Sequence, residues 1–234
     1  FVIGGFGSDY INIDRLTSEK FGDDTGHDVI VGDNGYAHFA IVTSEQSESG
    51  RASVIEEIES NYAEYGLDDF IYSAAGDDIV VGGSGADEIY ASDNDPGVVD
   101  KDIVLGDNGR VVFQVHSNDV GHAEYLYTPL VPYATVVTAE TLRVDDKASE
   151  AATYHGGVDV IHTFDGEDIV IGGDAGDVVL AGEGDYRDIV VGDYGVAEFD
   201  AATELVIKIA STDHSYGGSD DIMVGDGDDF VIGG

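Results

Sequence analysis

Aspartates recur along this chain at steps of nine residues. The steps join Asp69, Asp78 and Asp87, then Asp159, Asp168 and Asp177, and finally Asp220 and Asp229. A glycine-rich turn precedes most of them and a short apolar run follows, as in the segment Gly82–Ile89. Nine residues are enough for one tight turn and one short strand. The spacing therefore predicts a stack of short strands, and the 33 glycines argue against a conventional packed globule.

A second motif marks three larger repeats. Its copies are Asp28–Gly35, Asp102–Gly109 and Asp188–Gly195. We divide the single repeat domain 1–234 into repeats 1–78, 79–168 and 169–229. Residues 230–234 repeat Phe1–Gly5 without change and would start the next copy. We therefore expect copies to join head to tail, either within a longer chain of which this is an excerpt or as subunits of a filament.

Three segments leave the nine-residue rhythm, namely 36–67, 110–157 and 196–218. In the second, Val111–Val115 and Ala134–Thr138 alternate like the arms of an antiparallel hairpin. Val196–Phe199 and Leu205–Ile209 do the same in the third. Ser53–Glu59, in the first, is compatible with a strand or a short helix.

The short apolar runs predict one inward residue per strand. The predicted inward residues are all β-branched: Ile11, Ile30, Ile71, Val80, Ile89, Val104, Ile161, Val170, Val179, Val190, Ile222 and Val231. On alternate strands the flanking residues are apolar too, as Ile79 and Val81 are. Strands that are apolar on both faces are normally covered on both faces. We expect the hairpins to form that cover as a third β layer, with a neighbouring subunit as the alternative.

The charge of the chain requires cations. Its 49 acidic residues against nine Lys and Arg give a formal net charge of -40, and this self-repulsion destabilises a compact state unless it is neutralised. The basic residues are scattered singly, so nucleic acid and anionic membrane surfaces are unlikely partners. The 42% hydrophobic content is too high for a disordered acidic tail. The chain is expected to fold when counter-ions are present.

The nonapeptides resemble the repeats-in-toxin family of hemolysin-type calcium-binding repeats, with the pattern Gly-Gly-x-Gly-x-Asp. Gly82–Ile89 and Gly172–Val179 match it most closely. The resemblance covers about half of the chain, namely the nonapeptides, and does not extend to the hairpins. The chain also resembles segments of very large secreted bacterial repeat proteins. The resemblance implies an all-β fold, a right-handed parallel β-roll or β-helix solenoid. The packing of the antiparallel hairpins on one outer face is predicted from the apolar flanking residues and not from the resemblance. The turns Ser73–Gly76 and Thr163–Gly166 lack the leading glycines and are weaker site candidates.

The resemblance also implies several Ca²⁺ ions held between successive turns. Calcium takes six to eight oxygen ligands in flexible geometry, which glycine carbonyls and a turn-closing aspartate would supply. The implied aspartate ligands are Asp9, Asp28, Asp69, Asp78, Asp87, Asp102, Asp159, Asp168, Asp177, Asp188, Asp220 and Asp229, with Gly82, Gly85, Gly172 and Gly227 among the glycines. For Asp33, Asp107 and Asp193 both a ligand role and an ordinary turn role stay open, because their turns lack the closing aspartate.

The motifs favour a structural role over catalysis. The histidines show no zinc-protease spacing and the glycines form no nucleophile elbow. We therefore expect a secreted, non-enzymatic calcium-binding segment at a bacterial surface, forming a rod or filament for adhesion, matrix or coating. The alternatives are a calcium-triggered folding and export module of a type I-secreted enzyme or toxin, and a glycan-binding adhesin. A glycan or matrix surface would use Tyr125, Tyr127, Tyr133 and Tyr154, although cross-strand aromatic packing explains these residues more simply.

Overall fold

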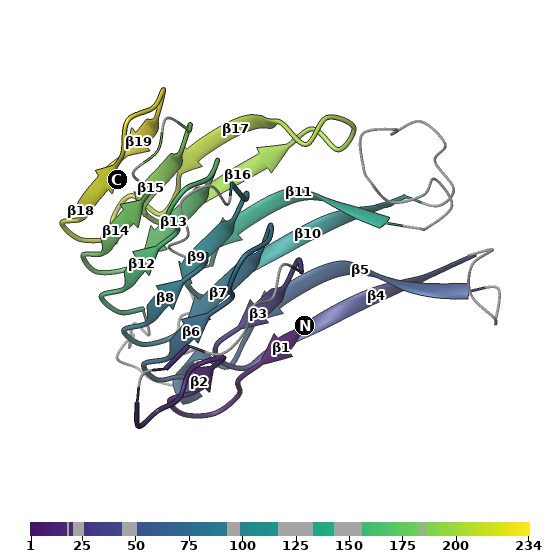
Figure 1. Cartoon of the computed structure of the whole chain (residues 1–234), viewed down its shortest axis with the longest axis horizontal. Coiled ribbons are helices and arrows are strands. Elements are labelled where there is room, and N and C mark those ends of the chain that lie inside the picture. The colour runs from purple at the N-terminus through teal and green to yellow at the C-terminus, as the bar shows by residue number, and fades with distance from the viewer. Residues whose placement is uncertain are drawn as a thin grey trace.

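The computed structural model is all-β and contains three sheets (Figure 1). It describes residues 1–17, 19–20, 26–43, 51–92, 99–116, 133–142, 156–182, 184 and 186–234. Within these residues one three-residue 3-10 helix, Ala63–Tyr65, accompanies nineteen strands. No helix among them is both long and apolar enough to cross a membrane.

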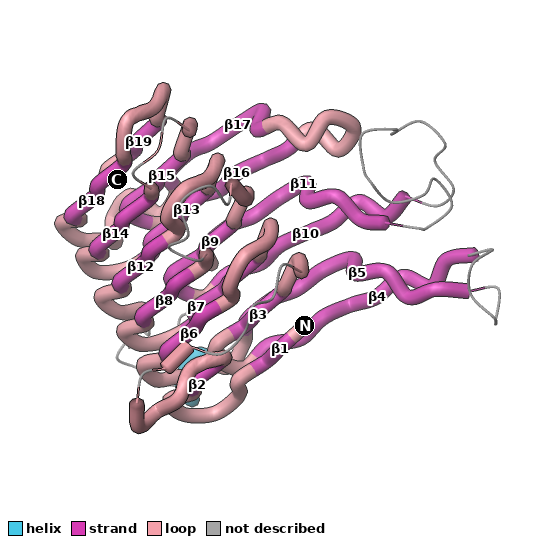
Figure 2. Tube along the Cα trace, in the orientation of Figure 1, coloured by secondary structure: helices cyan, strands magenta, loops and turns pink. Residues whose placement is uncertain are grey.

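The chain alternates between two parallel sheets, as the tube in Figure 2 shows. The first sheet contains β1 (Val2–Ile3), β3 (Val29–Val31), β7 (Ile79–Gly83), β9 (Ile103–Asp107), β13 (Ile169–Gly173), β15 (Ile189–Asp193) and β19 (Phe230–Ile232), in that order. The second contains β2 (Tyr10–Ile11), β6 (Phe70–Tyr72), β8 (Glu88–Tyr90), β12 (Val160–His162), β14 (Val178–Ala181) and β18 (Asp221–Val224). Both sheets therefore follow the sequence from one end of the molecule to the other.

A narrow core lies between the two parallel sheets. Parallel registers such as Ile30↔Val80 and Val170↔Val190 align one β-branched residue per strand, and ten of the predicted inward residues are buried in one cluster. Ile222 packs against this cluster and is partly buried. Val231 pairs with buried Val190 and so lies on the same inward face, but it is 45% exposed because β19 is the outermost described strand of the first sheet.

The three hairpins form one antiparallel sheet. It contains β4 (Gly35–Thr43), β5 (Arg51–Ser60), β10 (Gly109–His116), β11 (Tyr133–Thr141), β16 (Gly195–Phe199) and β17 (Val206–Ser211). Ser53–Glu59 is therefore strand, because its alternating side chains suit β5, which pairs with β4 on one side and β10 on the other. The pairs β5·β10 and β11·β16 join neighbouring hairpins into one layer.

The hairpin sheet covers the outer face of the first parallel sheet, as expected. Val31, Val81 and Leu105 of the parallel sheet are buried in one cluster with Ile58 and Val111 of the hairpins. Each hairpin begins directly after a strand of the first sheet, with only Asn108, for example, between β9 and β10. Turns that carry a hairpin alternate with turns that do not, so the three hairpins are evenly spaced along the stack.

Candidate cation-binding edges

The predicted aspartates stand in two columns, one at each edge of the paired parallel sheets. We call the turns that lead from the first sheet to the second the glycine edge, with Asp9, Asp69, Asp87, Asp159, Asp177 and Asp220. The turns that lead back form the opposite edge, with Asp28, Asp78, Asp102, Asp168, Asp188 and Asp229. The structure thus brings all twelve together in sequence order.

One hydrogen bond links each aspartate to the next in its column. The backbone N–H donates to Oδ1 of the following aspartate, at 2.7 Å from Asp69 to Asp87 and 2.8 Å from Asp87 to Asp159. The remaining N···O distances on the glycine edge are 2.7, 2.9 and 3.0 Å, and those on the opposite edge lie between 2.7 and 3.0 Å. One carboxylate oxygen of each acceptor is therefore fixed in place by the backbone.

The second oxygen of every glycine-edge carboxylate is bare. Oδ2 of all six residues is buried and has no hydrogen-bond partner among the described residues. Burial raises the pKa of Asp69 to about 8 and that of Asp177 to about 7, and lifts the pKa of Asp87 and Asp159 well above the usual range. Buried carboxylates without a partner are costly, so this column calls for protons or a cation.

Glycine leaves a cradle beside each bare oxygen. A Cβ added at Gly82 would lie 2.6 Å from Asp87 Oδ2 and would collide with the carbonyl oxygen of Gly106. At Gly32 it would collide with Asp69 Oδ2 and the Gly82 carbonyl oxygen. The same pair of a carboxylate oxygen and a glycine carbonyl oxygen surrounds this point at the other four positions: Gly4, Gly106, Gly172 and Gly192. These oxygen-only cradles fit a hard cation such as Ca²⁺.

The opposite edge carries side chains where the glycine edge has none. Ser73, Ala91 and Thr163 follow the three-residue strands β6, β8 and β12 at the position that Gly82 occupies after Ile79–Val81. The Ser73 hydroxyl donates to the Ala91 carbonyl oxygen at 2.8 Å. Burial raises the pKa of Asp78 to about 7, although the hydrogen bond from the Asp28 N–H lowers it. The turns that lack leading glycines therefore offer less room for an ion.

Asp33, Asp107 and Asp193 bind backbone N–H groups. Asp107 accepts from Gly157, where the chain returns from its hairpin, at 3.2 Å, and also from Asp174 in the next turn. Asp193 accepts from Gly218 at 2.9 Å, and Asp33 from Ser84 at 2.5 Å. These contacts give each aspartate a role in its turn. The ligand role stays open as well, because Asp33 Oδ1 is buried without a hydrogen-bond partner among the described residues.

The four glycines named from the sequence lie at different places. Gly82 and Gly172 line cradles of the glycine edge. Gly85 has φ of 117° and bridges to Gly156, so a side chain there would strain the turn. Gly227 lies on the opposite edge, where an added Cβ would meet the Tyr186 carbonyl oxygen and Asp229 Oδ1.

One buried aspartate escaped the sequence analysis. Asp100 is 3% exposed and forms a group with Asp102 and Asp168 in which one oxygen from each carboxylate lies within 4.8 Å of the others. The signal was present, because Asp100-Lys101-Asp102 aligns with Gly76-Asp77-Asp78 and puts an aspartate at a glycine position. The candidate glycan-binding residues Tyr125, Tyr127 and Tyr154 lie outside the described residues, as does the Tyr133 side chain.

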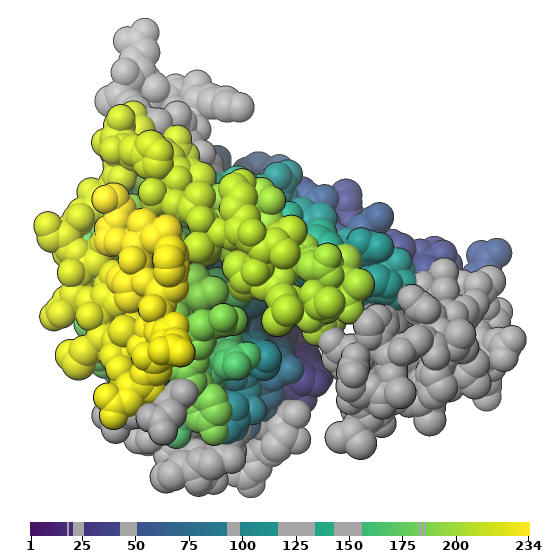
Figure 3. Space-filling view, turned by 90° about the horizontal axis from the view of Figure 1, so that it is seen from above, coloured from purple at the N-terminus to yellow at the C-terminus, as the bar shows by residue number. Residues whose placement is uncertain are grey.

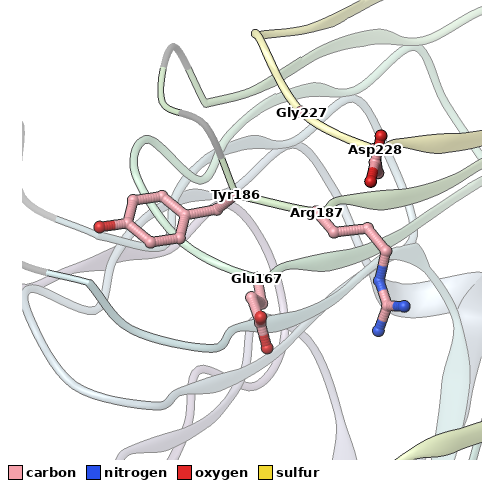
Figure 4. Close-up of a pocket in the computed structure, with 5 residues that line it drawn as sticks. All are labelled: Glu167, Tyr186, Arg187, Gly227 and Asp228. Atoms are coloured by element: carbon pink, nitrogen blue, oxygen red, sulfur yellow. The ribbon is translucent and has the colours of Figure 1, made fainter.

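An open depression lies on the opposite edge (Figure 4). Glu167, Tyr186, Arg187, Gly227 and Asp228 line it, and the lining is mainly polar. The Lys101 side chain lowers the pKa of Glu167, and the charge of Arg187 adds to this effect. Small-molecule sites are usually enclosed and mainly apolar, so this surface gives little support to a substrate pocket.

Comparison of the chain with family models, with curated proteins and with solved structures found no match. The function must therefore be argued from the geometry of the two edges.

Proposed function

We propose that the chain is a calcium-stabilised parallel β-roll that serves as a structural segment outside a bacterial cell. Strands that alternate between two parallel sheets support a solenoid, and the general preference for right-handed crossovers supports its hand. In this proposal the chain performs no catalysis. Its role is to form a stiff rod for adhesion, matrix or surface coating.

The observation that carries this proposal is the row of six cradles on the glycine edge. Each combines a bare, buried carboxylate oxygen with a backbone carbonyl oxygen, at a point that only glycine keeps open. A calcium ion at each cradle would join one turn to the next. It would also offset part of the formal charge of -40.

Calcium would then contribute directly to folding. Each strand contributes only one β-branched residue to most of the core between the parallel sheets. A glycine-rich backbone also loses much conformational entropy when it is ordered. An ion that binds only the folded state shifts the equilibrium by mass action. Extracellular calcium modules bind with dissociation constants of about 10⁻⁴ to 10⁻³ M, so folding would follow secretion into a calcium-rich medium.

Head-to-tail contact between copies, in one chain or between subunits, would extend the rod. Among the described strands, the outermost strands of the three sheets are β1, β2 and β4 at one end and β19, β18 and β17 at the other. The glycine-edge column of aspartates has a direction, because every linking N–H donates to the next aspartate toward the C-terminal end. A following copy would offer the Asp9 carboxylate to the Asp220 N–H and so continue the column.

The substitution Asp87→Asn tests the row of six cradles, because it should favour folding in chelator and disfavour folding in calcium. The new side chain keeps an Oδ1 acceptor for the Asp69 N–H, and its amide N–H₂ can donate to the carbonyl oxygen in the cradle. In chelator the variant should contain more β structure than the wild type, because one buried charge is gone. In calcium it should require a higher calcium concentration for half-folding, because one ligand is gone.

Circular dichroism during calcium titration and chelation measures both effects. The matched control is Asp226→Asn, which removes one charge from an exposed residue. It should change neither the β content in chelator nor the calcium concentration for half-folding. Equal β content of the wild type in calcium and in chelator would refute the proposal.

The export-module alternative shares the calcium-dependent folding and differs in assembly. Light scattering in calcium separates the two, since a rod-forming segment gives long particles and an export module stays monomeric. A glycan-binding role would require a reproducible glycan ligand.

A further inference from the structure

Asp100 occupies a glycine position in the turn before β9. The corresponding residues of neighbouring turns are Gly76 and Gly166, and Asp100 forms a parallel bridge with Gly166. The Glu167 N–H donates to the Asp100 carbonyl oxygen at 3.1 Å. The backbone of this turn thus pairs with that of the neighbouring turn, and Asp100 adds a carboxylate side chain.

This carboxylate meets two others in the interior. Asp100, Asp102 and Asp168 are 3%, 1% and 0% exposed, and one oxygen from each lies within 4.8 Å of the others. Three buried oxygens have no hydrogen-bond partner among the described residues, namely Asp100 Oδ1, Asp102 Oδ2 and Asp168 Oδ2. Each carboxylate therefore retains one bare oxygen.

The other oxygen of each carboxylate is held by a hydrogen bond. Asp102 Oδ1 accepts the Asp78 N–H at 2.9 Å, and Asp168 Oδ1 accepts the Asp102 N–H at 2.9 Å. Asp100 Oδ2 accepts the Ser92 hydroxyl at 2.9 Å and the Gly76 N–H at 3.2 Å. The group is therefore positioned before any ligand arrives, which lowers the cost of binding.

Lys101 and Arg187, two basic residues near this turn, are exposed. Lys101 Nζ lies 2.6 Å from Glu167 Oε2 in a largely exposed ion pair, and Arg187 lines the surface depression of Figure 4. Burial, together with the charge of Asp168, raises the pKa of Asp102 to about 11. A multivalent cation would relieve this repulsion, as buried charges require a partner.

We propose that Asp100, Asp102 and Asp168 bind one hard divalent cation, with calcium as the ion to test, at a site separate from the glycine-edge row. The site uses three side-chain carboxylates in place of glycine carbonyl oxygens. All its donors are oxygens, which suits Ca²⁺, Mg²⁺ or Mn²⁺ better than zinc or copper. It extends the proposed calcium-dependent fold, and the third ligand makes it the best-formed ion site of the opposite edge.

Counting bound calcium by equilibrium dialysis tests the site with two variants. Asp100→Gly restores the residue of the neighbouring turns, and Asp100→Asn preserves the shape of the side chain while removing its charge. Each should fold in calcium by circular dichroism and bind one ion fewer than the wild type. Asp226→Asn, the exposed control, should bind the wild-type number.

The same experiment on Asp87→Asn separates this site from the glycine-edge row. If the Asp100 variants lose an ion and Asp87→Asn does not, the result would support the three-carboxylate site and contradict calcium binding at the glycine-edge row of cradles. An unchanged ion count in both folded Asp100 variants would overturn the three-carboxylate site, whatever the row does.

Discussion

At the scale of single residues, the two oxygens of each glycine-edge carboxylate have different tasks. In all of them except Asp9, Oδ1 accepts the backbone N–H of the preceding aspartate and sets the spacing between turns, whereas Oδ2 lies bare beside a glycine carbonyl in all six. A hydrogen bond to one oxygen fixes the direction of the other. The fold therefore aims its unsatisfied oxygens in the absence of any ion.

The raised pKa values of the buried glycine-edge aspartates predict how pH affects the stability of the calcium-free chain. The pKa of Asp69 is raised to about 8 and that of Asp177 to about 7, against an ordinary value near 4 in the unfolded chain. The folded state then binds more protons than the unfolded state between these values, so stability falls as pH rises through the folded pKa. In calcium-free buffer, β structure should increase as pH is lowered from 8 to 5.

Circular dichroism in metal-depleted buffer checks this dependence. With saturating calcium the gain should disappear or reverse, because protons then compete with the ion for the same oxygens. A metal-free chain that loses β structure on acidification over this range would contradict the assignment of buried, partnerless carboxylates.

At the scale of elements, the hairpins supply much of the apolar core. Ile58 of β5 is fully buried against the first parallel sheet, and Ile41 of β4, in the same hairpin, is 69% exposed. Ile58→Ala should lower the free energy of unfolding in calcium by about 2–5 kcal/mol, because it leaves a cavity in a packed layer. Ile41→Ala should change it by less than about 0.5 kcal/mol.

Denaturant unfolding of both variants in saturating calcium measures the difference. Similar free energies of unfolding for Ile58→Ala and Ile41→Ala would mean that the hairpin sheet adds little to the stability of the parallel sheets.

Much of this arrangement could be predicted from local sequence. The nine-residue spacing predicted one turn and one short strand per step, and the resemblance implied a parallel β-roll. The structure then places Asp69 and Asp87 in one column and Asp78 in the other. Alternation predicted the strands of two hairpins. The joining of hairpins through β5·β10 could not be predicted, because it depends on the spacing of turns distant in sequence. Asp100 was missed because its turn is longer than nine residues and hid the alignment with Gly76 and Gly166.

At the scale of the whole molecule, the ends differ from the middle. Ile30 and Val80 are fully buried between neighbouring strands, whereas Val2 and Val231 at the two ends of the first sheet are 37% and 45% exposed. Figure 3 looks onto the C-terminal end, where the last residues are uncovered. Exposed strand edges readily pair with other strands, so the proposed head-to-tail assembly would bring these two edges into contact.

A lysine at the C-terminal end should block this contact. Val231→Lys places a charge on the residue that would be buried under the next strand, and charged residues on edges prevent strand pairing. We expect the wild type to form particles larger than the monomer in calcium and the variant to stay monomeric, with equal β content. Leu16→Lys, at a residue that is 93% exposed, is the matched control and should assemble normally. Analytical ultracentrifugation in calcium and in chelator measures this, and assembly of Val231→Lys to the wild-type size would place the contact between copies elsewhere on the molecule.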